Sequence, residues 1–297
     1  MKVVVSGASG LIGKALVPAL RAEGHEVLRL VRREPSSADE IHWDPAAGAL
    51  DSTELEGTDA IVNLSGENIG QRWTTSRKRE ILDSRTTATD LLARTAAALQ
   101  PRPSVFVCAG GVGIYGDRGD EIVTEESTLG SGFEADVGRA WEAAAGPARE
   151  AGIRVVNFRQ GIVLAKGGGA LERMLPPFKL GIGGRVGSGK QWWSWVAISD
   201  VTAAYAFALR NELAGIVNLC APNPVTNKQF TDALGKALRR PTIFPAPAIV
   251  VRTLFGEMGD NVLLRGRRAL PARLLGAGFD FAAPTIDDAL ADIFSAR

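Results

Sequence analysis

The first thirteen residues constrain the fold of this chain more than any other stretch. Residues 3–5 are a β-branched run, typical of a strand that is buried on both faces. Gly7, Gly10 and Gly13 follow at three-residue spacing, and residues 11–20 have the apolar pattern of a helix. A strand that turns through glycines into a helix directs free backbone N–H groups and the positive end of the helix dipole at one point, which suits a pyrophosphate. We therefore predict a dinucleotide site; the alternative is a glycine-rich turn without a ligand.

Each glycine of this loop has a separate expected task. Gly7 would form the tight turn, Gly10 would let the phosphates approach the backbone, and Gly13 would let helix and strand pack closely. Pro18 lies inside the predicted helix and should kink it. The predicted cofactor contacts of the loop are Gly7, Ser9, Gly10, Leu11, Ile12 and Gly13.

The end of the second predicted strand, residues 26–31, indicates which dinucleotide binds. NAD-binding folds usually place an acid here for the ribose 2′-hydroxyl, whereas an arginine accommodates a 2′-phosphate. This chain has Arg32 and Arg33, and two guanidinium groups can bind a phosphate dianion. The residues predict NADP rather than NAD; the alternative is a solvated basic turn.

The rest of the first half alternates strands with helices, which predicts an α/β fold with a doubly wound, Rossmann-type parallel sheet. Leu64, Ser65 and Gly66 follow a strand expected beside the first one, so their backbone is predicted to contact the second half of the nucleotide. The further strands are predicted at residues 40–43, 59–64, 105–109 and 155–158, with helices at 76–99 and 134–151.

Beyond Arg159 the alternation breaks down, which predicts two domains. Residues 1–160 would form the NADP-binding domain, and residues 161–297 a smaller α+β substrate lobe with a C-terminal extension. A strand at residues 216–220 could return to the first domain. Trp192, Trp193 and Trp195 could build an aromatic wall around a substrate or a hydrophobic plug between lobes, and the residues alone favour neither reading.

Composition excludes several classes of partner. The net charge of +1 gives no reason to expect nucleic acid or an anionic membrane as partner. No apolar run approaches the ~20 residues that cross a bilayer, and no signal peptide precedes the first strand, so a cytoplasmic location is expected. Cys108 and Cys220 lie in apolar runs and are predicted to be buried thiols. No metal site is predicted.

Several motifs resemble those of the extended short-chain dehydrogenases/reductases. They are the glycine loop and residues 63–66, 114–116 and 159–163. More narrowly, residues 43–45, 66–69 and 221–227 look like the atypical "epimerase family protein" subgroup of the NAD(P)-dependent epimerase/dehydratase family, and the resemblance covers essentially the whole chain. The resemblance implies NADP contacts at the glycine loop and at Arg32, Leu64, Ser65, Glu80, Arg85 and Val163.

The usual catalytic residues of that superfamily are missing. Its members use a tyrosine as general acid/base, a lysine four residues later and a serine on a preceding strand end. Aligning Glu142 with the glutamate that usually follows the lysine places Glu134 at the tyrosine, Gly138 at the lysine and Gly110 near the serine. Tyr115, in the motif at residues 114–116, is the catalytic candidate. Glu134, Asp136 and Arg139 are other polar candidates, each of which could equally be an exposed helix residue.

These observations predict an NADP-binding oxidoreductase or epimerase of atypical short-chain type that acts on an unidentified small molecule. Trp193 and Trp195 replace an arginine that relatives use to hold a sugar diphosphate, which disfavours a nucleotide sugar. The alternative function is a non-catalytic NADP(H) sensor whose output is a protein partner. Helices on the outer faces could form a homodimer.

Overall fold

The computed structural model describes residues 1–295. Its main sheet has eight strands in the order β12-β8-β6-β5-β1-β2-β3-β4, and every neighbouring pair is parallel except β3 with β4. The order reverses between β1 and β5, the point at which doubly wound sheets bind their ligands. The strands are β1 (Lys2–Ser6), β2 (Glu26–Val31), β3 (Glu40–Asp44), β4 (Ala49–Leu50), β5 (Ala60–Asn63), β6 (Val105–Cys108), β8 (Arg154–Gln160) and β12 (Gly215–Leu219).

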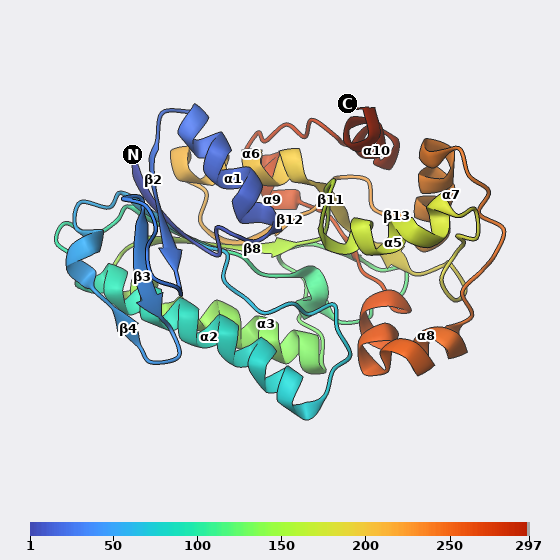
Figure 1. Cartoon of the computed structure of the whole chain (residues 1–297), viewed down its shortest axis with the longest axis horizontal. Helices are drawn as coiled ribbons and strands as arrows, with labels where there is room; N and C mark the ends of the chain where they lie inside the picture. The colour runs from blue at the N-terminus through green and yellow to red at the C-terminus, as the bar shows by residue number, and fades with distance from the viewer. Residues whose placement is uncertain (296–297) are drawn as a thin grey trace.

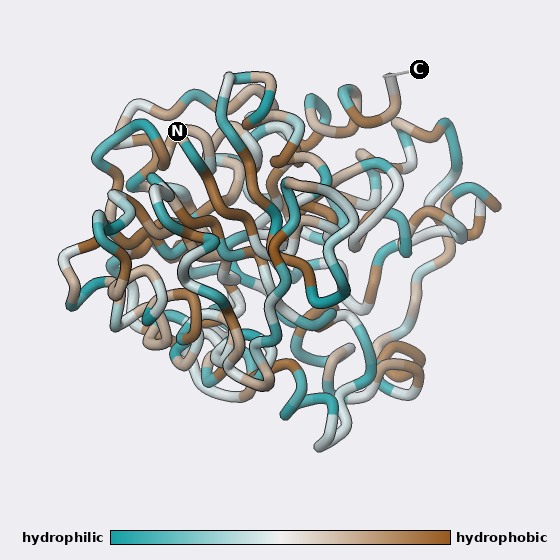
Figure 2. Tube along the Cα trace, turned by 60° about the vertical axis from the view of Figure 1, so that its left-hand side comes forward, coloured by the Kyte–Doolittle hydropathy of each residue, from teal (hydrophilic) through white to brown (hydrophobic). Residues whose placement is uncertain are grey.

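Helices cover both faces of this sheet, which confirms the predicted α/β, Rossmann-type architecture. On one face lie α1 (Leu11–Ala22) and α6 (Ile198–Arg210), and on the other lie α2 (Thr75–Ala98) and α3 (Phe133–Ala144) (Figure 1). The short helix α4 (Gly146–Glu150) packs beside α2 and α3 on that second face. Val3 and Val5 face the first layer and Val4 faces the second, as the two-residue period of a strand requires. The trace becomes hydrophobic along β1 directly after the N-terminus (Figure 2).

Two helices differ from their predicted form. The helix α1 runs through Pro18 to Ala22; Pro18 lies on the exposed face, where water can reach the carbonyl that the proline leaves unpaired. The single helix predicted at residues 134–151 is two helices, α3 and α4, and Pro147 occupies the first turn of the second. Proline is favoured there because the first helical N–H groups have no partner within the helix.

Elements beyond residue 160 return to the main sheet. The strand β12 pairs with β8 at the sheet edge, so the strand expected at residues 216–220 does lie there, and α6 packs beside α1. The sheet layer is therefore built from two separate stretches of chain. A domain boundary at residue 160 would assign α6 to the smaller lobe, whereas α6 packs on the main sheet.

Most of the remaining elements form a smaller lobe at one end of the molecule (Figure 1). Its core holds Trp193 and Trp195. The short strand pairs are β9 (Ile162–Leu164) with β11 (Trp195–Ala197), β10 (Trp192–Trp193) with β13 (Val225–Thr226), and β7 (Ile122–Val123) with β14 (Arg268–Ala269). The helices of this lobe are α5 (Gly169–Lys179), α7 (Asn227–Leu238), α8 (Ala248–Phe255) and α10 (Ile286–Ser295), and η3 (Gly259–Leu263) follows α8. The helix α9 (Ala272–Gly276) packs on β12, and the short turns η1 (Ser52–Leu55) and η2 (Val112–Tyr115) pack in the sheet domain. None of the helices in residues 1–295 has the length and apolar character needed to span a bilayer.

Candidate functional site

The glycine loop between β1 and α1 forms a tight cradle at the point where the strand order reverses. Gly7 has a φ of +68°, and a Cβ atom there would lie 2.8 Å from the carbonyl carbon of Leu64. A Cβ at Gly13 would lie 2.5 Å from the Cα of Ala8, so only glycine lets α1 pack this closely. No side chain caps the first turn of α1, so its N–H groups stay open for an anion. This geometry fits a pyrophosphate.

The predicted contacts after β5 lie directly beside this loop. The Ser6 hydroxyl donates to Oδ1 of Asn63 at 2.6 Å, and the Ser65 hydroxyl donates to the Ser6 oxygen at 2.9 Å. The backbone N–H of Leu64 donates to the carbonyl of Ser6. These bonds join the ends of β1 and β5, so residues 64–66 and the glycine loop form one surface.

Val163 reaches the same surface from the C-terminal half of the chain. A Cβ at Gly169 would lie 2.7 Å from Cδ2 of Leu11 and 3.7 Å from the carbonyl oxygen of Val163. Leu11 therefore packs against the start of α5, next to β9. Ser9 and Gly10 lie exposed at the tip of the loop, and Leu11 and Ile12 are half-buried.

Arg85 places a buried positive charge beside this surface. Its side chain is 8% exposed, one guanidinium N–H donates to the carbonyl of Ile81 at 3.0 Å, and the guanidinium lies 4.8 Å from the centre of the Trp141 ring. A Cβ at Gly66 would lie 3.1 Å from Cζ of Arg85, so the glycine makes room for the guanidinium. Burial lowers the pKa of Arg85 to about 10, which leaves it charged at neutral pH. No carboxylate among residues 1–295 forms an ion pair with it, so it is available to an anionic ligand.

Glu80, which resemblance alone places in the site, has a different environment. It lies exposed on α2, where its carboxylate accepts hydrogen bonds from Ser76 and Arg77. Arg77 also lies 3.8 Å from Glu67, so Glu67, Arg77 and Glu80 form a network of partly exposed charges. A contact of Glu80 with a cofactor stays a prediction.

The two arginines after β2 have distinct roles in the structure. Arg33 binds both carboxylate oxygens of Glu40, at 2.5 and 2.8 Å, and Ser36 donates two further hydrogen bonds to that carboxylate. Arg32 is exposed and has no hydrogen bond or ion pair with any residue from 1 to 295. Arg32 is thus the arginine free to bind a 2′-phosphate, and Arg33 holds the turn in place.

The Glu40 ion pair predicts a pH dependence of stability. Hydrogen bonds from Arg33 and then Ser36 lower the pKa of Glu40 from its usual 4.5 to about 2. Because the pKa is lower in the folded state, the stabilisation is complete above pH 4.5 and is lost as the pH falls toward 2. We expect Arg33→Ala to be less stable than wild type at neutral pH and closer to it in acid. The loss is partial because Arg29 stays 3.2 Å from Glu40.

Urea unfolding of both proteins at neutral and acidic pH measures this difference. The matched control is Arg32→Ala, which removes a neighbouring guanidinium without a carboxylate partner and should leave the pH dependence unchanged. An Arg33→Ala protein with the same acid sensitivity as wild type would contradict the assignment.

Tyr115 lies inside the protein, which contradicts its predicted catalytic role. Its side chain is fully buried, its hydroxyl donates to Oδ1 of Asn218 at 2.8 Å, and it accepts from Nη1 of Arg159 at 2.9 Å. Burial raises the pKa of Tyr115, whereas a general acid/base needs a pKa lowered toward neutral pH. The sequence motif places this tyrosine near the strand end, but the strand-to-helix turn points it into the core.

We expect Tyr115→Phe to lower the free energy of unfolding by about 1–2 kcal/mol, because Asn218 and Arg159 each lose a buried hydrogen-bond partner. The affinity for the dinucleotide should not change. Denaturant unfolding and cofactor titration on the same preparation separate the two effects. A variant of wild-type stability that no longer binds would return Tyr115 to the site.

The positions of the missing lysine and serine are filled by other groups. A Cβ at Gly138 would lie 2.9 Å from Cβ of Ile114, and a Cβ at Gly110 would lie 2.6 Å from the carbonyl oxygen of Phe158. A longer side chain at either position would require the neighbouring segment to move. The usual catalytic groups are therefore excluded by packing as well as by sequence.

Glu134, at the position of the tyrosine, forms an ion pair that sequence reasoning missed. Its carboxylate binds the guanidinium of Arg267, which also donates to the carbonyl of Gly116 at 2.9 Å. Both side chains are largely buried. The partners are 133 residues apart, so only the fold brings them together.

Two of the three tryptophans predicted to line a substrate form a hydrophobic core instead. Trp193 and Trp195 are 4% and 0% exposed, and Trp193 packs on Phe230 with ring centres 5.1 Å apart. Both point to the same side because alternate residues of an extended segment share a face. Trp192 is half-buried and donates from Nε1 to Asp120 at 2.8 Å. Trp193 and Trp195 are therefore core residues of the smaller lobe and do not line a substrate site.

No cluster of His, Cys, Asp and Glu suited to a metal ion occurs in the part of the chain that the structure describes. The titratable groups near the strand ends are arginines and the Glu134 carboxylate. Arg85 and the open N-terminus of α1 place positive charge at these strand ends, which suits a negatively charged ligand.

Comparison with known families identifies two regions. The model of the NAD dependent epimerase/dehydratase family matches residues 3–220. A second model, described as a domain of unknown function, matches residues 246–293, the stretch that contributes Arg267.

Individual proteins are similar over nearly the whole chain. The epimerase family protein Mb2239 of Mycobacterium bovis is 46% identical over 290 residues, which is 97% of this chain and 96% of that protein. The crystal structure of the human epimerase family protein SDR39U1 (isoform 2) with NADPH has a TM-score of 0.92 and 36% identity, with both chains covered completely. A nucleoside-diphosphate sugar epimerase of Corynebacterium glutamicum has a TM-score of 0.81 and 37% identity, over 99% of this chain and 58% of that one.

Proposed function

Since this chain belongs to the NAD dependent epimerase/dehydratase family, we propose that it binds NADP(H) and uses it in an oxidoreduction or epimerisation of a small molecule. The observation that carries the choice of cofactor is Arg32, which has no partner among residues 1–295 and stands where NAD-binding folds place an acid. The similar human protein was crystallised with NADPH.

Each part of the surface would bind one part of the cofactor. The N–H groups of the glycine loop would hold the pyrophosphate, and Arg32 would hold the 2′-phosphate. Arg85, buried beside Gly66, would face the second half of the nucleotide. When bound, the nicotinamide supplies the hydride chemistry, and the protein contributes orientation and electrostatics.

The chain must manage proton transfer without the usual tyrosine, lysine and serine. Glu134 is the one ionisable side chain at those three positions, and Arg267 holds its carboxylate in place. A carboxylate so held can accept a hydrogen bond or a proton from a substrate hydroxyl, which favours an alcohol as the group that reacts.

Titration with NADPH and NADH, followed by a panel of alcohols and carbonyl compounds, tests this function. We expect NADPH to bind more tightly than NADH and at least one substrate to change the nicotinamide absorbance. Absence of NADPH binding would refute the proposal. We also propose that the protein is cytoplasmic and forms a homodimer. Fractionation of cells tests the location, and light scattering of the purified protein tests the dimer.

A second function, a non-catalytic NADP(H) sensor, is favoured by one specific observation. Ile114 and the Phe158 carbonyl occupy the space that side chains at the lysine and serine positions would need, so restoring a catalytic side chain there would require the neighbouring residues to move. A sensor must bind the oxidised and reduced cofactor with different affinities, since equal affinities shift no equilibrium. Unequal affinities without turnover would support the sensor, and turnover would exclude it.

A further inference from the structure

Exposed hydrophobic side chains concentrate on one part of the smaller lobe. Twelve large hydrophobic side chains are markedly exposed among the described residues, and eight of them lie in residues 180–182 and 243–255. Their exposed fractions run from 39% to 74%. Single exposed hydrophobics are normal, but such a concentration marks an interaction site. We name these eight the apolar patch: Leu180, Ile182, Ile243, Phe244, Ile249, Val250, Leu254 and Phe255.

The two segments of the apolar patch lie side by side. Gly184 forms an antiparallel bridge with Ile243, and the backbone N–H of Ala246 donates to the carbonyl of Arg185 at 2.9 Å. Helix α8 begins two residues later, and α5, α7 and α8 lie at the same end of the molecule (Figure 1). Val251 is the one buried residue of α8. The apolar residues of this helix are therefore not explained by packing on the protein's own core.

The chain on either side of the apolar patch carries a strong positive charge, although the patch segments themselves hold only Arg252. Residues 179–190 and 228–252 contain eight Lys and Arg but a single acid, Asp232, a net charge of +7. The whole chain has a net charge of +1, so the other residues carry −6. The four cations without any hydrogen bond or ion pair to a residue of the described chain are Lys179, Lys190, Arg239 and Arg240.

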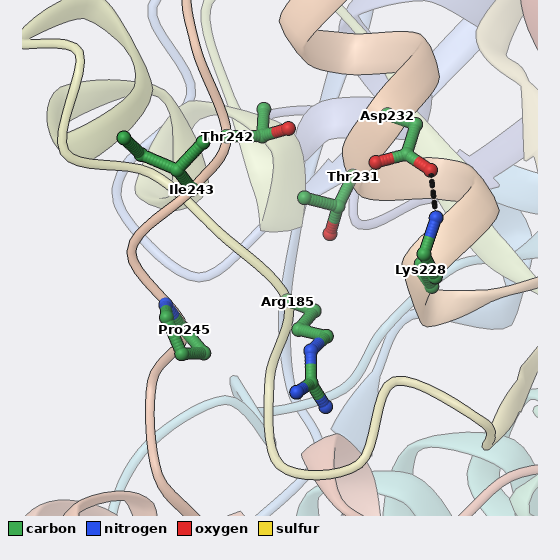
Figure 3. A pocket seen from close by; sticks show the side chains of 7 residues that line it. All are labelled: Arg185, Lys228, Thr231, Asp232, Thr242, Ile243 and Pro245. Carbon is green, nitrogen blue, oxygen red and sulfur yellow. Dashed lines mark hydrogen bonds and ion pairs between the residues drawn. The ribbon is translucent and has the colours of Figure 1, made fainter.

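A small cavity of about 110 Å³ lies at the border of the apolar patch, beside Ile243 (Figure 3). The Arg185 guanidinium is held there by the carbonyls of Gly187 and Ser188, at 3.0 and 2.8 Å. Thr231 is 2% exposed and lines the cavity, and its hydroxyl has no hydrogen-bond partner among residues 1–295. The fixed guanidinium and the free hydroxyl of Thr231 are donors suited to one phosphate group, and the Asp232 carboxylate in the same lining is paired with Lys228.

We propose that this face docks on the surface of an anionic phospholipid membrane. The apolar side chains insert into the interfacial region, the surrounding cations lie near the headgroups, and the cavity takes one headgroup phosphate. The net charge of the chain conceals this property because it averages the +7 region with an acidic remainder.

The charge and the shape of this face favour a membrane over other partners. A symmetric dimer would place the same basic surface against itself, and the like charges would repel. Leu180, Ile243 and Ile249 are 73–74% exposed, so they protrude and do not line a groove that would hold a peptide. A lipid interface accepts protruding side chains without a matching shape.

Co-sedimentation with phosphatidylcholine vesicles, with and without phosphatidylglycerol, tests the proposal on the full chain. We expect binding to the anionic vesicles only, and weaker binding as salt is added. The double variant Ile249→Glu/Leu254→Glu should lower the partition coefficient at least tenfold. Arg239→Gln and Arg240→Gln should lower it about fivefold each, the effect of about 1 kcal/mol per cation near an anionic surface.

Leu275→Glu is the matched control, since Leu275 is 49% exposed on α9 and lies outside the apolar patch. It should bind vesicles as wild type does. Retained NADPH affinity in every variant shows that the fold is intact. No binding to anionic vesicles, equal binding to neutral ones, or wild-type binding by the double variant would overturn the proposal. Capture of an acidic protein without vesicle binding would do the same.

Discussion

Replacing Arg159 by methionine should lower the free energy of unfolding by about 3–5 kcal/mol, the cost of breaking a buried ion pair. Arg159 is 4% exposed and binds both carboxylate oxygens of Glu142, at 2.7 and 2.9 Å. It also donates to the Tyr115 hydroxyl and lies 4.9 Å from the centre of the same ring. Its removal leaves a largely buried carboxylate without a cation and a buried hydroxyl without a donor.

The electrostatics of the pair agree with this expectation. Burial lowers the pKa of Arg159, but the hydrogen bonds and charges of Glu142 and Tyr115 together outweigh it, so the pKa is raised. The guanidinium is therefore charged in the folded protein. The ion pair joins α3 to β8 and thus holds the face of the helix that carries Glu134.

Urea denaturation of Arg159→Met and of two other variants measures the effect. Arg139→Met is the matched control, because Arg139 pairs with Asp136 on the exposed side of the same helix and should cost less than about 1 kcal/mol. The double variant Arg159→Met/Glu142→Leu should recover much of the loss, since it leaves no unpaired charge. A loss of less than about 1 kcal/mol in Arg159→Met would contradict the structural role.

The features predicted well from sequence are those that depend on near neighbours along the chain. The glycine loop is one example, because strand, turn and helix lie within residues 2–22 and each follows from local residue types. The doubly wound topology predicts the strand at residues 59–64 beside the first strand, and β5 does pair with β1. The contacts of residues 64–66 with the loop follow in turn, since both lie at the ends of neighbouring strands.

The features that sequence reasoning missed depend on which way a side chain points or on a distant partner. Trp193 and Trp195 are equally compatible with a wall and a plug until the facing layer is known. Arg267 reaches Glu134 across 133 residues of chain, and no local pattern pairs them. The net charge of +1 does not reveal the basic and apolar face of the smaller lobe, because acidic residues elsewhere in the chain balance its positive charge.

Arg32 and Arg33 show most directly what the sequence cannot predict, because two adjacent arginines differ only in their surroundings in the fold. Glu40 returns to the end of β2 because β3 pairs with it, and it binds Arg33. That ion pair leaves Arg32 as the free cation of the turn among residues 1–295. The sequence alone offers both arginines to the 2′-phosphate, and the structure separates them.

Arg32→Ala should therefore weaken NADPH binding on the order of 100-fold, and Arg33→Ala much less. Charge-assisted hydrogen bonds to a phosphate contribute up to about 3 kcal/mol, and every 1.4 kcal/mol is a tenfold change in affinity. NADH lacks the 2′-phosphate, so its affinity should change little in Arg32→Ala. The preference for NADPH over NADH is thus expected to disappear in this variant and to persist in Arg33→Ala.

Calorimetric titration of wild type and both variants with NADPH and NADH measures the dissociation constants. The ratio of each variant's constant to that of wild type, for each of the two ligands, decides this assignment. Thermal unfolding without ligand serves as the control, because Arg32 has no partner among the described residues and its loss should leave the midpoint unchanged. Arg33→Ala should lower that midpoint, since it frees the buried carboxylate of Glu40. Equal losses of NADPH affinity in the two variants would mean that Arg33 leaves Glu40 when the cofactor binds, and the division of roles between the arginines would be wrong.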